Sequence, residues 1–81
     1  MNAAAGNDDI VIDARDLPPP EPMEKVLLVL GLKRPGQAVR LLIHRQPFPL
    51  YELLDQQHYQ HLTRALDDGN FEVIIRDRPD Q

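Results

Sequence analysis

The fold of this chain is decided around Asp16-Leu17-Pro18-Pro19-Pro20-Glu21-Pro22, which joins the apolar triplet Ile10-Val11-Ile12 to a long apolar segment that starts at Met23. Four of these seven residues are prolines, which lack a backbone N–H and hold the backbone φ angle nearly fixed. Pro22 suits the first turn of a helix, because the N–H that it lacks would have no partner there. The stretch therefore predicts a rigid connection from a strand to a helix.

The segments on either side of this connection show strand and helix spacing. Ile10-Val11-Ile12 does not alternate with polar residues, so it predicts a short strand that is buried on both faces. After Pro22, apolar residues recur at helical spacing, with two neighbours that widen the apolar face: Met23, Val26, Leu27, Leu30, Leu28 and Val29. Gly31 is expected to cap the C-terminus of this helix.

Turn residues and alternation divide the rest of the chain. Residues 34–37, Arg-Pro-Gly-Gln, fit a type II turn with glycine at its third position. Alternation over residues 39–43 predicts a strand, and Pro49 can open a second helix whose inner face carries leucines. Residues 71–75 alternate in the same way, and Asp68-Gly69 ahead of them is a strong hairpin signal.

Residues 57–66 fit two structures. A helix would place His61, Leu62 and Ala65 on the face of the preceding leucines, whereas a strand would put alternate residues on opposite sides. The Asp-Gly turn needs a strand on both sides, which favours the strand. The predicted order is then β-α-β-α-β-β, an α/β two-layer sandwich in which a four-stranded mixed sheet carries both helices on one face. The last strand is expected at an edge of the sheet, where pairing would support a weak homodimer.

Length and charge limit the classes of protein. The chain has 81 residues and a net charge of −4, so we expect a single domain over residues 9–78, a disordered tail over 1–8 and a short tail over 79–81. The acidic balance disfavours nucleic acids and anionic membranes, which attract basic proteins. Residues 1–9 lack the basic and apolar regions of a secretory signal, and no run can span a bilayer. A cytoplasmic protein, monomeric or weakly dimeric, is expected.

The carboxyl ends of the first two strands are the predicted place for a site. If these strands are parallel, they end at one edge of the sheet, where open α/β sheets tend to bind ligands. The two proline-rich loops would then meet, although the plainer interpretation of their polar residues is a solvated loop. The candidate residues of this binding edge are Asp13, Arg15, Asp16, Pro19, Pro20, Glu21, Pro22, His44, Arg45, Pro47 and Pro49.

The residue types exclude some chemistries. The sequence contains neither cysteine nor serine, and Thr63 is the only hydroxyl side chain apart from the two tyrosines. Nucleophilic catalysis by a Ser–His or Cys–His pair is therefore excluded. A phosphate site of the usual kind is disfavoured as well, because prolines offer no N–H at the predicted helix start and Glu21 and Glu24 bring negative charge to it.

Histidines leave two further hypotheses for this edge. His44 beside Asp13 or Asp16 would suit a general acid–base pair, or a small-ligand or metal site, while a surface histidine near a carboxylate is the plainer interpretation. His58 and His61 share a face only if residues 57–66 are helical. Scattered histidines are weak evidence for a metal, so we expect neither a metal nor a cofactor.

The elbow at residues 19–22, Pro-Pro-Glu-Pro, resembles a motif of the TusA-like (SirA-like) superfamily, which carries Cys-Pro-x-Pro after its first strand. Pro20 and Pro22 match the two prolines, and Pro19 stands where the cysteine would be. That cysteine carries a persulfide in the superfamily. The resemblance therefore implies the fold but not the sulfur transfer.

The chain is more similar to an uncharacterised branch of that superfamily that lacks the cysteine. The shared residues span roughly 10–77 and are Asp13-Ala14-Arg15, Leu17, Pro20-Glu21-Pro22, His44-x-x-Pro47-x-Pro49-Leu50-Tyr51, Leu53-Leu54 and Asp68-Gly69. In this branch the position of His58 tends to be a helix-ending glycine, and histidine tolerates the left-handed conformation better than most residues. The resemblance also supports the strand over 58–66.

The resemblance implies a bacterial domain of undetermined function, often found beside hemerythrin-like or other redox-related domains. From it we expect a non-enzymatic accessory module that binds an unknown protein partner through the rigid proline edge. The alternative is a small-ligand or metal site at Asp13, Arg15, Asp16 and His44. A third interpretation is a regulator that binds the partners of true sulfur carriers without accepting sulfur.

Overall fold

The computed structural model describes residues 8–79. Six elements follow one another along the chain: β1 (Ile10–Asp13), α1 (Glu21–Leu32), β2 (Val39–Ile43), α2 (Phe48–Gln56), β3 (Tyr59–Ala65) and β4 (Phe71–Asp77). The predicted order β-α-β-α-β-β is confirmed, including the strand in the ambiguous region. The predicted tails fall on residues 1–8 and 79–81, of which 1–7 and 80–81 lie outside the described part.

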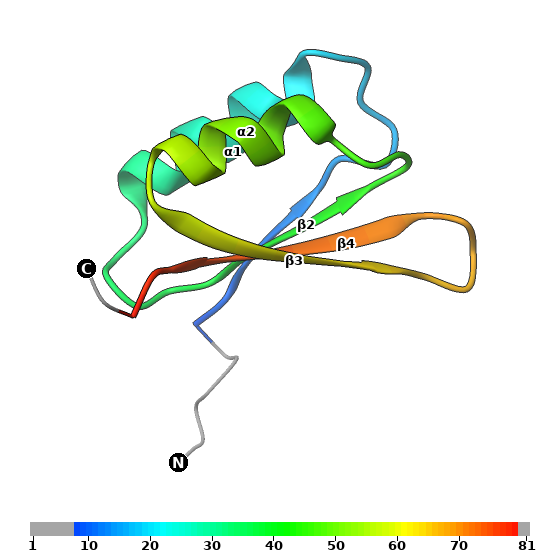
Figure 1. Ribbon diagram of the computed structural model, residues 1–81. Coiled ribbons are helices and arrows are strands. Elements are labelled where there is room, and N and C mark those ends of the chain that lie inside the picture. Colours follow the sequence, from blue (N-terminus) through cyan, green and yellow to red (C-terminus); the bar gives the residue numbers. More distant parts are fainter. Residues whose placement is uncertain (1–7, 80–81) are drawn as a thin grey trace.

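The four strands form one mixed sheet in the order β1-β2-β4-β3. β1 runs parallel to β2, and β4 pairs antiparallel with both β2 and β3. Both helices cover the same face of this sheet, as Figure 1 shows. The expectation that the last strand lies at an edge is wrong, because the β3–β4 hairpin joins the sheet through β4. The edges are β1 and β3, so a dimer that pairs through β4 is ruled out.

The core lies between the helices and the sheet. The most enclosed side chains of the sheet come from the two central strands and are fully buried: Val39, Leu41, Val73 and Ile75. The helices contribute Val26 from α1 and Leu50 and Leu54 from α2. Alternation along β2 and β4 therefore places one set of side chains in the core and the other on the helix-free face.

The prediction that β1 is buried on both faces is wrong. Ile12 is 8% exposed and faces the core, whereas Val11 is 57% exposed. The physical reason is that no element within residues 8–79 covers the second face of the sheet, so the intervening residue of an apolar strand remains in solvent. The apolar triplet was correctly interpreted as a strand, but its lack of alternation does not report burial.

Helix α1 differs from the expectation at two positions. Leu28 does not widen the buried face, since it is 64% exposed. Gly31 is not the C-cap, because the helix continues to Leu32 and the N–H of Lys33 donates to the carbonyl of Val29 at 2.8 Å. The next glycine along the chain, Gly36, does adopt the left-handed conformation, with φ +85°, in the predicted turn over residues 34–37.

The second half of the chain follows the sequence closely. Pro49 lies in the first turn of α2, and His58 has φ 67° between α2 and β3, in the expected left-handed conformation. In the hairpin between β3 and β4, the N–H of Leu66 donates to the carbonyl of Asn70 at 2.8 Å, and Gly69 has φ +87°. Among residues 8–79, no helix is long and apolar enough to cross a membrane.

Candidate functional site

Three loops meet at the carboxyl edge of β1 and β2. Because these strands are parallel, the loops that follow them leave the sheet side by side and lead into the N-termini of α1 and α2. The β3–β4 hairpin loop reaches the same edge, since Phe71 at the start of β4 is paired with Ile43 at the end of β2. The right-hand side of Figure 1 shows this gathering. Sequence reasoning predicted the first two loops but missed the third.

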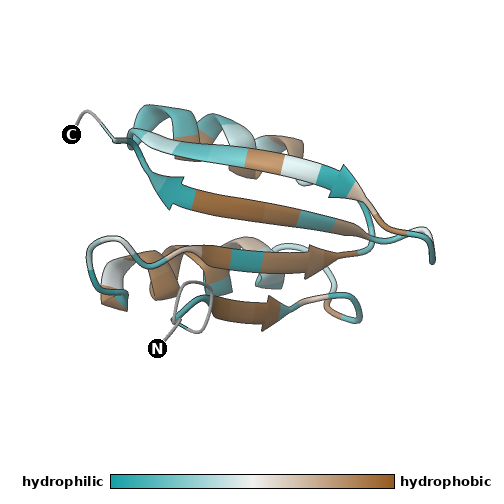
Figure 2. Cartoon of the chain, turned by 90° about the horizontal axis from the view of Figure 1, so that it is seen from below, coloured by the Kyte–Doolittle hydropathy of each residue, from teal (hydrophilic) through white to brown (hydrophobic). Residues whose placement is uncertain are grey.

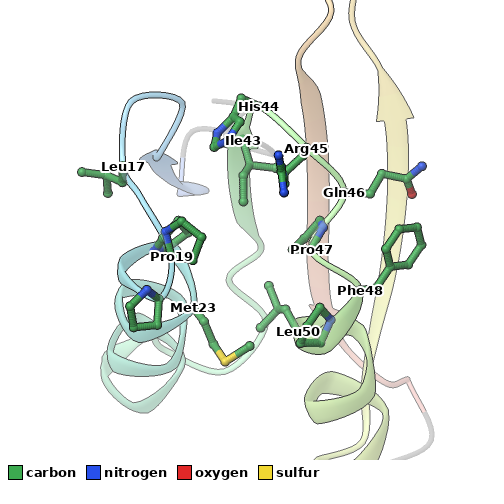
Figure 3. A pocket seen from close by; sticks show the side chains of 13 residues that line it. Leu17, Pro19, Met23, Ile43, His44, Arg45, Gln46, Pro47, Phe48 and Leu50 are labelled. Atoms are coloured by element: carbon green, nitrogen blue, oxygen red, sulfur yellow. The ribbon is translucent and has the colours of Figure 1, made fainter.

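A pocket of about 470 Å³ opens between the two proline-rich loops. Its lining includes seven of the predicted edge residues: Pro19, Pro20, Pro22, His44, Arg45, Pro47 and Pro49. In Figure 3, Met23 of α1 and Leu50 of α2 point toward one another across the bottom of this pocket, and Arg45 and His44 lie at its upper end. The prediction that the two loops would meet is therefore confirmed.

Five apolar lining residues were missed: Leu17, Met23, Ile43, Phe48 and Leu50; Gln46 of the second proline-rich loop lines the pocket as well. They were overlooked because the search at this edge favoured polar and proline residues. The signal was present, since the last apolar residue of a strand and the first apolar residues of two helices must surround the same edge. Phe48 is 63% exposed, which is unusual for so large an apolar side chain.

Four predicted residues do not line the pocket: Asp13, Arg15, Asp16 and Glu21. Arg15 instead donates from Nε to Asp13 Oδ1 at 2.9 Å and from Nη2 to Asp13 Oδ2 at 2.7 Å. The hydrogen bond from the Arg15 side chain lowers the pKa of Asp13 to about 2. Arg15 Nη1 also lies 4.0 Å from Asp68 Oδ2 of the hairpin loop. Among the hydrogen bonds of residues 8–79, Asp13 is thus paired with Arg15 and not with His44.

The N-termini of both helices border the pocket, but most of their amides are already bonded or are replaced by proline. The N–H of Glu24 donates to the carbonyl of Pro20 at 3.1 Å, and the N–H of Leu50 donates to that of Pro47 at 2.9 Å. Pro22 and Pro49 have no N–H to offer. Anion binding at a helix start needs free amides and a positive end, so this pocket is suited to apolar groups.

His61 has a structural setting away from the pocket. Its Nε2 lies 3.0 Å from Asp55 Oδ1, and its ring stacks on Tyr51 with centroids 4.7 Å apart. The Tyr51 hydroxyl is in turn hydrogen-bonded to the Thr63 hydroxyl at 2.5 Å. These contacts join α2 to β3. Within residues 8–79, no group of three or more His, Cys, Asp or Glu side chains is arranged to hold a metal ion.

The element order, the parallel β1–β2 pair and the proline-lined edge define an α/β sandwich of the SirA-like class. A crystal structure of the SirA-like protein from Desulfitobacterium hafniense is similar to the chain, with a TM-score of 0.71 and 26% sequence identity. The similarity covers 82% of this chain and 93% of that one.

Residues 11–77 match the sequence profile of the family described as "Uncharacterized conserved protein (DUF2249)", and the chain belongs to that family. No curated protein matches the chain. The resemblance drawn from the proline elbow and the spaced histidine and proline residues is confirmed at the level of the superfamily and its fold.

Proposed function

We propose that the chain is a non-enzymatic accessory module that binds a protein partner by accepting an apolar side chain of that partner in the pocket between its proline-rich loops. The observation that carries the proposal is the chemistry of the pocket wall. Met23, Ile43 and Leu50 lie among prolines, and most of the helix-start amides nearby are bonded within their own turns. Prolines also lose little conformational entropy when a partner docks.

The proposal excludes persulfide transfer. A sulfur carrier needs a cysteine thiolate as nucleophile and attachment point, and this sequence contains no cysteine. A redox-related bacterial pathway and a cytoplasmic location are part of the proposal only through the family resemblance. The alternative ligand site at Asp13, Arg15, Asp16 and His44 has less support, because Asp13 and Arg15 satisfy one another.

The first test asks whether the pocket accepts an apolar group at all. Isopentanol mimics a leucine side chain and can be titrated into the isotope-labelled protein while NMR shifts are recorded. We expect saturable shifts at Met23, Ile43 and Leu50. The Phe48→Asp variant should reduce them, because it places a charge at an exposed lining position. Shifts that are absent, or unchanged in the variant, would contradict the proposal.

The second test uses cell extract and a matched control. Proteins retained by the wild-type chain are compared by quantitative mass spectrometry with those retained by Phe48→Asp and by Leu32→Asp. Leu32 is 75% exposed on α1 and lies outside the pocket lining. A true partner should lose about tenfold in affinity with the first variant alone, as measured with the purified pair. Equal losses in both variants would count against the pocket.

A further inference from the structure

The helix-free face of the sheet is a second surface with its own chemistry. Its side chains are the alternate residues of the four strands that do not face the helices. Figure 2 views this face with the helices behind it, and brown apolar segments run along β1, β2 and β4, interrupted by teal polar ones. The apolar contribution comes from Val11, Leu42, Leu62 and Ile74. Leu62 is 67% exposed and Val11 57%.

These apolar residues lie close together on the face, with Leu62 and Ile74 directly paired and Arg40 between Ile74 and Val11. Leu62 of β3 is paired with Ile74 of β4, and Ile74 is paired in turn with Arg40 of β2. Arg40 is the neighbour of Val11 on β1. Side chains directly opposite on adjacent strands lie within contact distance. A shallow hollow of about 370 Å³, lined in part by Leu62 and Ile74, lies on this side. Apolar side chains gathered on an exposed face are one feature of interaction surfaces.

Three arginine side chains lie within or beside the apolar residues of this face. Arg40 and Arg64 both donate to Glu72, from Arg40 Nε to Oε2 and from Arg64 Nε to Oε1, each at 2.7 Å. The Glu72 side chain is only 3% exposed between them, while the Arg64 side chain is 62% exposed. A guanidinium has five N–H donors, so most of those on Arg64 remain free for another acceptor. Arg76 adds a third positive charge on the same face.

Glu72 therefore holds two guanidiniums in place without cancelling the charge of the face. The face carries the positive charges of three arginines, Arg40, Arg64 and Arg76, and the negative charge of Glu72. Asp13, at the far edge, is neutralised by Arg15. The face is positive although the whole chain carries −4. Side chains that are already fixed lose less entropy when they bind. Such a face selects an occupant with carboxylates around an apolar stripe.

We propose that this face docks an acidic amphipathic helix of a protein partner. Four strands spaced about 4.8 Å apart span about 14 Å, enough to seat one helix of about 10–12 Å diameter. The apolar stripe of the helix would contact Leu62, Ile74 and Leu42, and its carboxylates would meet Arg40 and Arg64.

Nucleic acid suits the face less well. Its aromatic neighbours Tyr59 and Phe71 pack against the core, so they provide no stacking platform for bases. The negative charge of the rest of the chain also repels phosphates. A second copy of the chain would bring two positive faces together. The surface is distinct from the proline-lined pocket, so the failure of one proposal would not affect the other.

The test uses three synthetic helical peptides that share one leucine stripe and differ only in their flanks, which carry Glu, Gln or Lys. Binding is followed by NMR shifts of the labelled protein. We expect the Glu peptide to bind with shifts at Leu42, Leu62 and Ile74, and the Lys peptide not to bind. Leu62→Gln should weaken the Glu peptide about tenfold, as for a central contact. Raising the salt concentration should weaken it further.

Leu32→Gln on α1 is the matched control, since it replaces another exposed leucine, 75% against 67% for Leu62, on the other side of the molecule. Because Leu62 is exposed, its replacement should leave the circular dichroism spectrum unchanged. The proposal is overturned if the Glu peptide causes no shifts at millimolar concentration, or if the Lys peptide binds as well. It is also overturned if a single-stranded oligonucleotide binds this face more tightly, or if the face instead mediates self-association in sedimentation experiments.

Discussion

Leu41 and Leu42 are neighbours in β2, yet they belong to different parts of the molecule. Leu41 is fully enclosed beneath the helices, whereas Leu42 lies on the helix-free face opposite Glu72. The same contrast separates Val73 from Ile74 in β4. Each central strand thus supplies the core with one set of side chains and the surface with the other. Buried and solvent-facing side chains therefore alternate at single-residue spacing along these strands.

The largest difference between the two faces is expected when Leu41 and Leu42 are each truncated to alanine. Leu41→Ala should lower the free energy of unfolding by about 2–5 kcal/mol, because it removes buried apolar contacts and leaves a cavity. Leu42→Ala should cost about 1 kcal/mol or less, as for a partly exposed position. Urea denaturation followed by circular dichroism measures both. Similar losses would show that something covers the second face as completely as the first.

Glu72 is a buried carboxylate on the helix-free face, and its removal should have the next largest effect. Glu72→Ala leaves Arg40 and Arg64 without their shared carboxylate and should cost about 1–3 kcal/mol, with the partial exposure of both arginines favouring the lower end. Glu24→Ala on the exposed side of α1 is the control and should change stability little. A Glu72 variant as stable as the wild type would mean that the cluster only orients the arginines.

The stability of the chain should also depend on pH, because two partly or fully buried carboxyl groups have lowered pKa values. Burial opposes ionisation of Glu72, but hydrogen bonds from Arg40 and Arg64 outweigh it, so the pKa of Glu72 is lowered. Hydrogen bonds from the Gly36 N–H and then from Lys33 lower the pKa of Asp77. A carboxyl group whose folded pKa is depressed binds fewer protons in the folded chain. Its stabilising contribution is present above the unfolded pKa and is lost as the pH falls through the folded pKa.

We therefore expect the urea midpoint to fall as the pH drops below the ordinary values of 4.5 for Glu72 and 3.8 for Asp77. The Glu72→Gln variant should show a shallower fall over this range, because one of the carboxyl groups with a lowered pKa no longer titrates. Glu24→Gln should follow the wild-type curve. A Glu72→Gln curve parallel to the wild type would argue that the pKa of Glu72 is the same in the folded and the unfolded chain.

The smallest expected effect comes from a position that belongs to neither face. Gly31 lies inside α1, and a β-carbon added there meets nothing within 4 Å. Gly31→Ala should stabilise the chain by about 0.5–1 kcal/mol, because alanine loses less entropy in a helix. Gly36→Ala should destabilise by contrast, since Gly36 has φ +85°. Thermal unfolding of both variants measures whether each substitution raises or lowers the stability of the chain. Destabilisation by Gly31→Ala would mean that glycine is needed there after all.

Most of the fold could be predicted because its signals are local. The prolines at the start of each helix, the glycine turn at 34–37 and the Asp-Gly hairpin act through backbone conformation within a few residues. The errors concern placement in space. Val11 and Leu28 are apolar and were expected inside, and β4 was expected at an edge. Whether an apolar residue is buried depends on how the helices and strands pack against one another, which its neighbours in the sequence do not specify.

The candidate site was predicted in part for the same reason. The meeting of two proline-rich loops follows from parallel strands, which the sequence order suggested. The pairing of Asp13 with Arg15 and the apolar pocket floor at Met23 and Leu50 depend on side-chain geometry. The position of the β3–β4 hairpin loop at this edge was not predicted, because the sequence did not show that β4 pairs with β2.

The sequence by itself determined the elements, their order, the rigid elbow at Asp16–Pro22 and the loss of any thiol chemistry, because residue type and short-range spacing decide these. Only the tertiary structure decided that β4 is central, that one face of the sheet stays open and that Glu72 joins Arg40 to Arg64 across three strands. The physical reason is that these features come from strand pairing between distant segments. Each side chain there takes its environment from neighbours that the local sequence does not specify.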